Sequence, residues 1–383
     1  MINLNSPQIK KLEIKYMKES LKGGWVSSGK FIKLFEKQIS NFTGSSYAIS
    51  CVNGTSALQL ALNIAKAKED TEVIIPSVSF IAAANSVIYN NASPIFMDVD
   101  KYLNIDTRKT IKFINENTYS RNGNTFNKKT KKKIVALIVV HVFGNAADIF
   151  PLKKICKKKN IILIEDAAES LGSFYKKKKR RHTGAVGDMG CLSFNANKII
   201  TTGGGGMILT NNKQIAKKAF FLSNQAKSDN IFFVHNKVGY NFRLPNINCA
   251  IGFAQFKYLK KFLYKKKLIH NYYKKNFNNK IKLMAPPNYC SSNYWMNVIK
   301  FSYKKNIINK AVDYFRNLKI ETRPVWKLLY EQKEFTKFEK FEVYNAKKYI
   351  SNCLCVPSSS NLKISNLKFI IKKISDFSKL YLK

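Results

Sequence analysis

The stretch Asn160-Ile161-Ile162-Leu163-Ile164-Glu165-Asp166 is a short apolar run that ends in two acidic residues. Its length and its continuous apolar character predict a strand that is buried on both faces. Other strands are predicted at 47–52, 72–76, 94–99 and 134–141, with helical spacing between them at 53–65 and 80–89. This alternation predicts an α/β fold, in which helices cover both faces of a mostly parallel sheet.

The character of the sequence changes near residue 255, where long stretches rich in Lys, Tyr and Phe begin. The later elements that we expect are a strand at 294–301 and helices at about 309–318 and 365–382. We therefore predict a large domain at 1–255 and a smaller C-terminal α+β domain at 256–383, with the N-terminal segment packing partly on the small domain. Two polar, basic segments are expected to be surface excursions: 115–133 and 175–183.

The formal net charge of +44 arises from 67 Lys and Arg residues against 23 Asp and Glu residues in a chain of 383. Such a charge would suit a polyanion, either nucleic acid or an acidic membrane surface. Arginine, which nucleic-acid readers use for bidentate contacts, is scarce. The chain is also rich in Asn, Ile, Phe and Tyr, the pattern that AT-rich coding produces. We therefore favour compositional bias and expect no specific nucleic-acid partner, only weak adhesion to anions that salt reverses.

Several classes of protein are excluded by simple patterns in the sequence. No apolar run reaches the roughly 20 residues of a membrane span, and the start of the chain lacks the apolar stretch of a secretory signal. Seven scattered cysteines suit neither a disulfide framework nor a metal site. We therefore expect a cytoplasmic protein with no membrane span and no metal.

Three segments carry groups that suit one cofactor, pyridoxal phosphate. Gly54-Thr55-Ser56 opens a helix after a strand, where backbone N–H groups and hydroxyls can hold a phosphate together with Ser193. Asp166 lies at the carboxyl edge of the sheet and needs a cationic partner. Lys198, followed by four glycines at 203–206, offers an amine for the cofactor's aldehyde. Taken alone, Gly54-Thr55-Ser56 is explained equally well as an ordinary helix cap, and Asp166 as a capping acid. The occurrence of all three segments in this order favours the cofactor.

Longer motifs surround these residues along the chain: W-V-S-S-G at 25–29, N-G-T-S-A-L at 53–58, P-S-V-S-F-I-A-A-A-N at 76–85, E-D-A-A-E at 165–169, S-F-N-A-N-K at 193–198 and G-Y-N-F-R at 239–243. With them the chain resembles, over nearly its whole length, the DegT/StrS family of nucleotide-sugar aminotransferases. The resemblance implies a fold-type I pyridoxal-phosphate transferase. The chain departs from the family pattern where many relatives have Gly-Glu-Gly-Gly and it has 203–206 all glycine, and where Glu169 is often Gln.

The resemblance implies a role for each matching residue. Lys198 is the Schiff-base lysine and then the proton shuttle, and Asp166 keeps the ring nitrogen of the cofactor protonated. Glu169 lies near the phenolic oxygen of the ring, and Phe80 stacks on the ring face. The phosphate is held by Gly54, Thr55, Ser56 and Ser193, helped by Asn241 from a neighbouring subunit. The resemblance therefore implies a homodimer with shared active sites.

The resemblance also implies transfer of an amino group from L-glutamate to a nucleotide-linked keto-sugar, in the biosynthesis of surface polysaccharides or nonulosonic acids. The glycine run and the segment 321–326 look most like the branch that acts on UDP-4-keto-6-deoxy-N-acetylhexosamines, as in legionaminic-acid and bacillosamine-type pathways. Candidate substrate ligands are Arg243 and Arg323, although a surface ion pair explains Arg323 equally well. Trp326 and His182 are further candidates, against a core aromatic and a solvated loop histidine.

Two rival functions remain open at this point. A relative that uses the same cofactor to dehydrate a sugar typically has histidine at the lysine position, so Lys198 argues against it. A non-catalytic regulator or polyanion-binding protein on the same fold would make the charge of the chain its functional feature. A cofactor absorbance band that shifts when glutamate is added would exclude this second alternative.

Overall fold

The computed structural model describes residues 1–382 except 177–179, 230, 278–280 and 303–305. Within these residues a central sheet has ten strands. Along its main path they run in the order β1 (Tyr47–Cys51), β11 (Gly206–Thr210), β10 (Met189–Ser193), β7 (Ile162–Asp166), β6 (Lys133–Val140), β2 (Thr71–Pro76), β3 (Ser93–Met97) and β16 (Lys340–Phe341). From β10 to β16 each neighbouring pair is parallel, whereas β11 is antiparallel to both of its neighbours. The predicted α/β fold with a mostly parallel sheet is confirmed.

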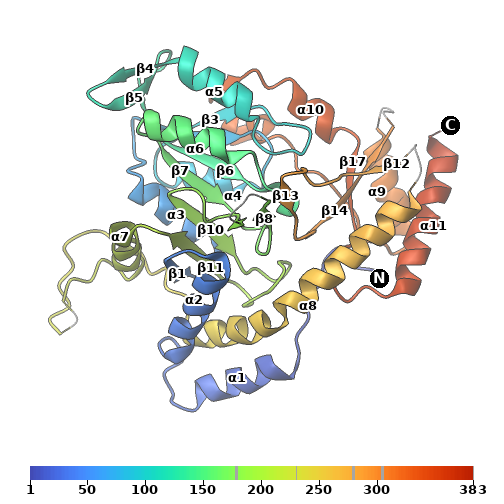
Figure 1. Ribbon diagram of the computed structural model, residues 1–383, viewed down its shortest axis with the longest axis horizontal. Coiled ribbons are helices and arrows are strands. Elements are labelled where there is room, and N and C mark those ends of the chain that lie inside the picture. The colour runs from blue at the N-terminus through green and yellow to red at the C-terminus, as the bar shows by residue number, and fades with distance from the viewer. Residues whose placement is uncertain (177–179, 230, 278–280, 303–305, 383) are drawn as a thin grey trace.

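Both faces of this sheet are buried, as the continuous apolar strands predict. Side chains of adjacent strand residues point to opposite faces, so Val73 and Ile75 join one hydrophobic cluster and Ile74 joins another. The helices around the sheet are α2 (Lys30–Thr43), α3 (Gly54–Ile64), α4 (Ala82–Ile88), α5 (Thr107–Glu116), α6 (Ile149–Lys158) and α7 (Lys213–Ser223) (Figure 1). Because the strands from β10 to β16 are parallel, their carboxyl ends meet at one edge of the sheet. Ligand sites of such sheets lie at this edge.

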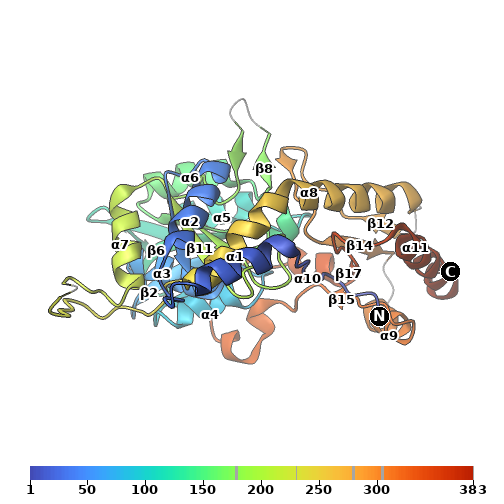
Figure 2. The ribbon, with the colours of Figure 1, turned by 90° about the horizontal axis from the view of Figure 1, so that it is seen from below.

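A second, four-stranded sheet forms the core of the C-terminal part, in the order β12 (Ile281–Leu283), β14 (Asn297–Phe301), β17 (Cys353–Val356) and β15 (Arg323–Pro324). Helices α9 (Ile307–Asn317) and α11 (Ile364–Tyr381) pack on it through a separate hydrophobic cluster. The 31-residue helix α8 (Asn246–Asn276) runs between the two parts (Figure 2). The expected boundary at 255 falls inside this helix, and β16 returns to the large sheet, so the chain crosses between the two parts more than once.

Both segments that were expected to be surface excursions contain paired strands. Residues 118–127 form a hairpin, β4 (Thr118–Arg121) and β5 (Asn124–Asn127), which pairs with β6. Its turn is Asn122-Gly123, both with positive φ, which is the turn chemistry that favours a two-residue hairpin. In the second segment, part of which (177–179) lies outside the described residues, β8 (Phe174–Tyr175) and β9 (Arg181–His182) pair with each other, and β8 also pairs with β13 (Cys290–Ser291).

The remaining elements are α1 (Lys11–Leu21), α10 (Asn345–Ile350) and three short 3₁₀ turns at Val142–Gly144, Leu329–Glu331 and Lys333–Phe335. The N-terminal segment packs on the small sheet's side of the molecule, where Ile2 pairs with Ile320. In the described parts of the chain, no helix combines the length and the apolar character that crossing a membrane requires.

Candidate active site

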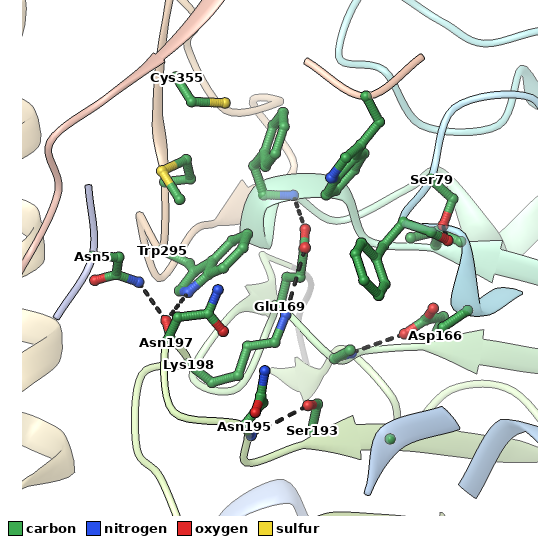
Figure 3. Close-up of a pocket in the computed structure, with 18 of the residues that line it drawn as sticks. Asn5, Ser79, Asp166, Glu169, Ser193, Asn195, Asn197, Lys198, Trp295 and Cys355 are labelled. Carbon is green, nitrogen blue, oxygen red and sulfur yellow. Dashed lines mark hydrogen bonds and ion pairs between the residues drawn. The ribbon is translucent and has the colours of Figure 1, made fainter. Parts of the chain in front are cut away.

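A cavity of about 580 Å³ lies at the carboxyl ends of β7 and β10, beneath residues of the small sheet (Figure 3). Its volume falls within the roughly 300–1,000 Å³ of small-molecule sites. The large sheet contributes Asp166 and Ser193, and the loop after β10 contributes Lys198. The small-sheet side contributes Trp295 and Arg323. The cavity thus brings together residues from both ends of the sequence.

Asp166 is the last residue of β7 and is almost fully buried at the cavity wall. Its carboxylate accepts one hydrogen bond, from the N–H of Ala168 at 3.1 Å. Burial raises the pKa of Asp166, and the Ala168 N–H and the nearby charge of Lys198 oppose that rise. Buried carboxylates normally have several donors, so Asp166 retains capacity for a further, cationic partner.

The neighbouring acid, Glu165, points away from the cavity and is saturated with hydrogen bonds. It accepts the backbone N–H groups of Gly184, Val186 and Gly187 and the Nε2–H of His141, the last at 2.9 Å. The Nδ1 of His141 accepts the N–H of Ala147, which places the ring proton on Nε2. Burial acts to raise the pKa of Glu165, but these bonds outweigh it and lower the pKa. The pair fixes the strand end beneath Asp166.

Lys198 projects into the cavity from the loop between β10 and β11, and its side chain is 14% exposed. Its Nζ lies 3.6 Å from Oε1 of Glu169 and 4.4 Å from the ring centroid of Trp295. Burial raises the pKa of Glu169 to about 7, against the lowering effect of Lys198 and of the Phe143 N–H. The Lys198 amine and the Glu169 carboxyl group therefore lie close together inside the cavity.

The predicted phosphate cradle lies at the start of α3. The N–H groups of Gly54 and Thr55 open this helix and so have no acceptor within it. Asn53 caps the helix by accepting the N–H of Ser56 at 2.7 Å. A Cβ at position 54 would lie only 3.0 Å from the Cβ of Ser193, so glycine allows the start of α3 to lie close to the end of β10. Ser56 itself is buried beside the cavity rather than lining it.

Aromatic side chains also line the cavity. Phe80 is 56% exposed and faces the cavity, with its ring centroid 6.5 Å from that of Trp326. Trp326 in turn packs 4.9 Å from the ring of Phe143. Arg323 lines the cavity and pairs with Glu321 at 3.1 Å, so the ion pair expected as its alternative role is formed within the cleft itself.

Besides Ser56, three predicted site residues lie outside this chain's cavity. Arg243 pairs with Glu36 at 2.9 Å and donates to the carbonyl of Ser50, so it does not line the cavity of its own chain, and its role as a substrate ligand stays a prediction. His182 is fully buried rather than solvated, and its Nε2 accepts the N–H of Gly172. Burial lowers the pKa of His182 to about 3. Asn241 is exposed on the surface.

Trp295 and Asn5 also line the cavity, although they belong to none of the motifs, together with Asn197 from the motif that ends at Lys198. The indole Nε1 of Trp295 donates to the carbonyl of Asn197 at 2.8 Å, and the side chain of Asn5 donates to the same carbonyl (Figure 3). These three residues are far apart in the sequence, and only the fold brings them together.

The donor set fits pyridoxal phosphate. The helix start at Gly54 and Thr55 with Ser193 suits a phosphate, the under-bonded Asp166 suits a ring nitrogen that carries a proton, and Lys198 supplies the amine. No group of three or more His, Cys, Asp or Glu side chains in the described ranges is arranged to hold a metal ion. On a mostly parallel sheet, this arrangement defines a pyridoxal-phosphate-dependent transferase.

Comparisons with known proteins agree. Residues 7–375 match the DegT/DnrJ/EryC1/StrS aminotransferase family, and the chain belongs to this family of pyridoxal-phosphate-dependent sugar aminotransferases. It is 31% identical over 381 residues to GDP-perosamine synthase of Escherichia coli O157:H7, covering 98% of each chain. It is 27% identical over 384 residues to UDP-4-amino-4,6-dideoxy-N-acetyl-beta-L-altrosamine transaminase of Campylobacter jejuni strain 81-176, covering 97% and 96%.

The fold has the same support from a solved structure. The aminotransferase TlmJ from Streptoalloteichus hindustanus superimposes with a TM-score of 0.89 at 22% identity, over 99% of each chain. The predicted family, fold, enzyme class and cofactor are confirmed.

Proposed function

We propose that the protein transfers an amino group from L-glutamate to the keto carbon of a nucleotide-linked 4-keto-6-deoxy sugar. The observation that carries the proposal is that the Lys198 amine lies 3.6 Å from Glu169 in a cavity that Asp166 also lines. An amine that is mostly shielded from water and close to a carboxyl group is suited to moving protons.

Each residue then has a defined task. Pyridoxal phosphate, when bound, supplies an electron sink for the charge that develops on the donor's α-carbon. Nζ of Lys198 takes the α-proton from the donor and later delivers a proton to the sugar carbon that receives the nitrogen. Glu169 holds a proton for Lys198, and the Asp166 carboxylate stabilises the protonated ring nitrogen. Trp295 and Phe80 bound the space in which these atoms meet.

Two kinds of sugar nucleotide are candidates for the acceptor. A UDP-linked 4-keto-6-deoxy-N-acetylhexosamine is supported by the motif at 321–326 and by the altrosamine transaminase relative. A GDP-linked keto-sugar is supported by the higher identity to GDP-perosamine synthase. Both substrates carry a diphosphate, and Arg323 at the cavity rim is the candidate cation for it or for the donor's carboxylate.

We further propose that the active unit is a homodimer. The segment between α7 and α8 projects from the body of the molecule (Figures 1 and 2) and includes the exposed Asn241. It exposes several large apolar side chains to 66–91%, namely Ile231, Phe232, Phe233 and Val238. Contiguous exposed apolar side chains of this kind indicate a protein–protein contact. A second copy that covers them would bring Asn241 toward a neighbouring phosphate cradle.

The test is to incubate the purified protein with pyridoxal phosphate, L-glutamate and, separately, UDP- and GDP-linked 4-keto-6-deoxy sugars. Products are identified by mass spectrometry and NMR, with Lys198→Ala as the control. We expect an amino sugar and 2-oxoglutarate in equal amounts from one of the two nucleotide series, and none from the control. No amino sugar from either series, or amination that persists in Lys198→Ala, would overturn the proposal.

A further inference from the structure

Lys266, on α8, is a buried cation outside the groups used above. Its residue is only 2% exposed, whereas Lys265 and Lys267 on the same helix are exposed. Among the described residues no carboxylate lies within ion-pair distance of it. A buried, unpaired ammonium is costly, so a lysine here calls for a specific reason.

The contacts of Lys266 supply that reason. Its Nζ donates to Oδ1 of Asn5 at 2.8 Å and to the carbonyl of Trp295 at 2.9 Å. Burial lowers its pKa to about 7. A neutral amine has two N–H groups, which match these two acceptors, so both bonds persist when the charge is lost.

Both partners of Lys266 lead to the loop that carries Lys198. The side chains of Asn5 and Trp295 each donate to the carbonyl of Asn197, the residue before Lys198 (Figure 3). The ring of Trp295 also lies 4.4 Å from the Lys198 Nζ. Lys266 therefore contacts the two residues that bind the carbonyl next to Lys198, and one of them, Trp295, also contacts the Lys198 amine.

This set of contacts also joins three separate parts of the chain. The N-terminal segment is already tied to the small sheet's side, since Leu4 donates its N–H to Glu321 and accepts the N–H of Ser358. Lys266 joins the same segment to α8 and to Trp295, which lies just before β14. Lys266 thus links Asn5 to Trp295, the two residues whose side chains bind the Asn197 carbonyl.

We propose that Lys266 is a positioning residue, which holds Trp295 and Asn5 and, through the Asn197 carbonyl, sets the working position of the Lys198 amine. The inference rests on the proposed role of Lys198 in amino transfer. Lys266 itself does not line the cavity.

The test compares Lys266→Met with the matched controls Lys265→Met and Lys267→Met, which make the same change on the exposed face of the helix. Hydrogen–deuterium exchange of residues 1–9 and 193–199 is followed in protein without added cofactor. We expect exchange in both segments to rise about tenfold or more in Lys266→Met alone, as loss of two hydrogen bonds implies, with β6 unchanged. In the loaded enzyme kcat should fall about tenfold or more while KM changes less.

Exchange that rises equally in β6 would show a merely structural lysine and overturn the proposal, as would no difference from the two controls. If Lys266→Met does not fold, Asn5→Ala removes one branch of the same set and should raise exchange at 193–199; unchanged exchange there would also overturn it. The exchange measurement does not depend on the sugar. Failure of the proposed substrate, with the exchange result intact, would therefore be recognised as a separate outcome.

Discussion

Glu165 and Asp166 are adjacent residues at the end of one strand, yet they face opposite environments. Glu165 is saturated by three backbone N–H groups and His141, and its pKa is lowered. Asp166, like Glu169 nearby, is equally buried but accepts one backbone N–H, and its pKa is raised. The contrast separates an acid that stabilises the fold from acids whose unmet bonding capacity is available to a ligand.

The strongest test of this contrast is Asp166→Asn. Turnover should fall by about 10²–10⁴-fold, because an amide cannot hold the ring nitrogen of the cofactor in its protonated form. Stability of the cofactor-free protein should be unchanged or higher, since a costly buried carboxylate is removed. Steady-state kinetics and denaturant unfolding measure the two effects. Full turnover would refute the role of Asp166.

Glu165→Leu should show the opposite pattern. It leaves three buried N–H groups and His141 without their acceptor, which should lower the free energy of unfolding by roughly 3–5 kcal/mol. Because folding lowers the pKa of Glu165, the difference from wild type should be full above pH 4.5 and shrink as the pH falls below it. Urea titrations at several pH values measure this; a stable variant would show that the bonds contribute little.

Glu169→Gln sharpens the comparison through its pH dependence. Folding raises the pKa of Glu169 from 4.5 to about 7, so the folded protein binds that proton more tightly across this window. Wild type should therefore lose roughly 3 kcal/mol more stability than the variant as the pH rises through the window. The measurement is the unfolding free energy of both cofactor-free proteins from pH 4.5 to 8. Parallel curves would contradict the burial cost assigned to Glu169.

Arg323→Met tests the small-sheet side of the cavity. Loss of an exposed cation should raise KM for the nucleotide sugar or for glutamate by about tenfold, with little change in kcat. The control is Arg316→Met, an exposed arginine that pairs with Asp313 on α9 and does not line this cavity. Equal kinetics for the two variants would remove Arg323 from the substrate site.

Much of the fold and of the site could be predicted from the sequence. Continuous apolar runs located the buried strands within a few residues, and the motifs around Asp166 and Lys198 lie together in the cavity. Such groups are predictable because each sits at a strand end or helix start, and parallel strand ends share one edge. The hairpin at 118–127 was also within reach, since Asn122-Gly123 is its signal.

Other features depend on partners that are distant in sequence. Arg243 was taken for a ligand because arginine is rare in the chain, but its partner, Glu36, lies 207 residues away. Lys266 is one lysine among many until Asn5, 261 residues away, lies beside it. No local pattern distinguishes a buried lysine from its exposed neighbours on α8, because only packing decides which side of the helix is covered.

The central claim is that the Lys198 amine, alone among the chain's many lysines, reacts with the cofactor. The most direct measurement is borohydride reduction of the protein loaded with pyridoxal phosphate, followed by proteolysis and mass spectrometry. We predict one stoichiometric adduct, on the peptide that contains Lys198, and none in Lys198→Ala. An adduct located on another lysine, or label spread over many, would contradict the account.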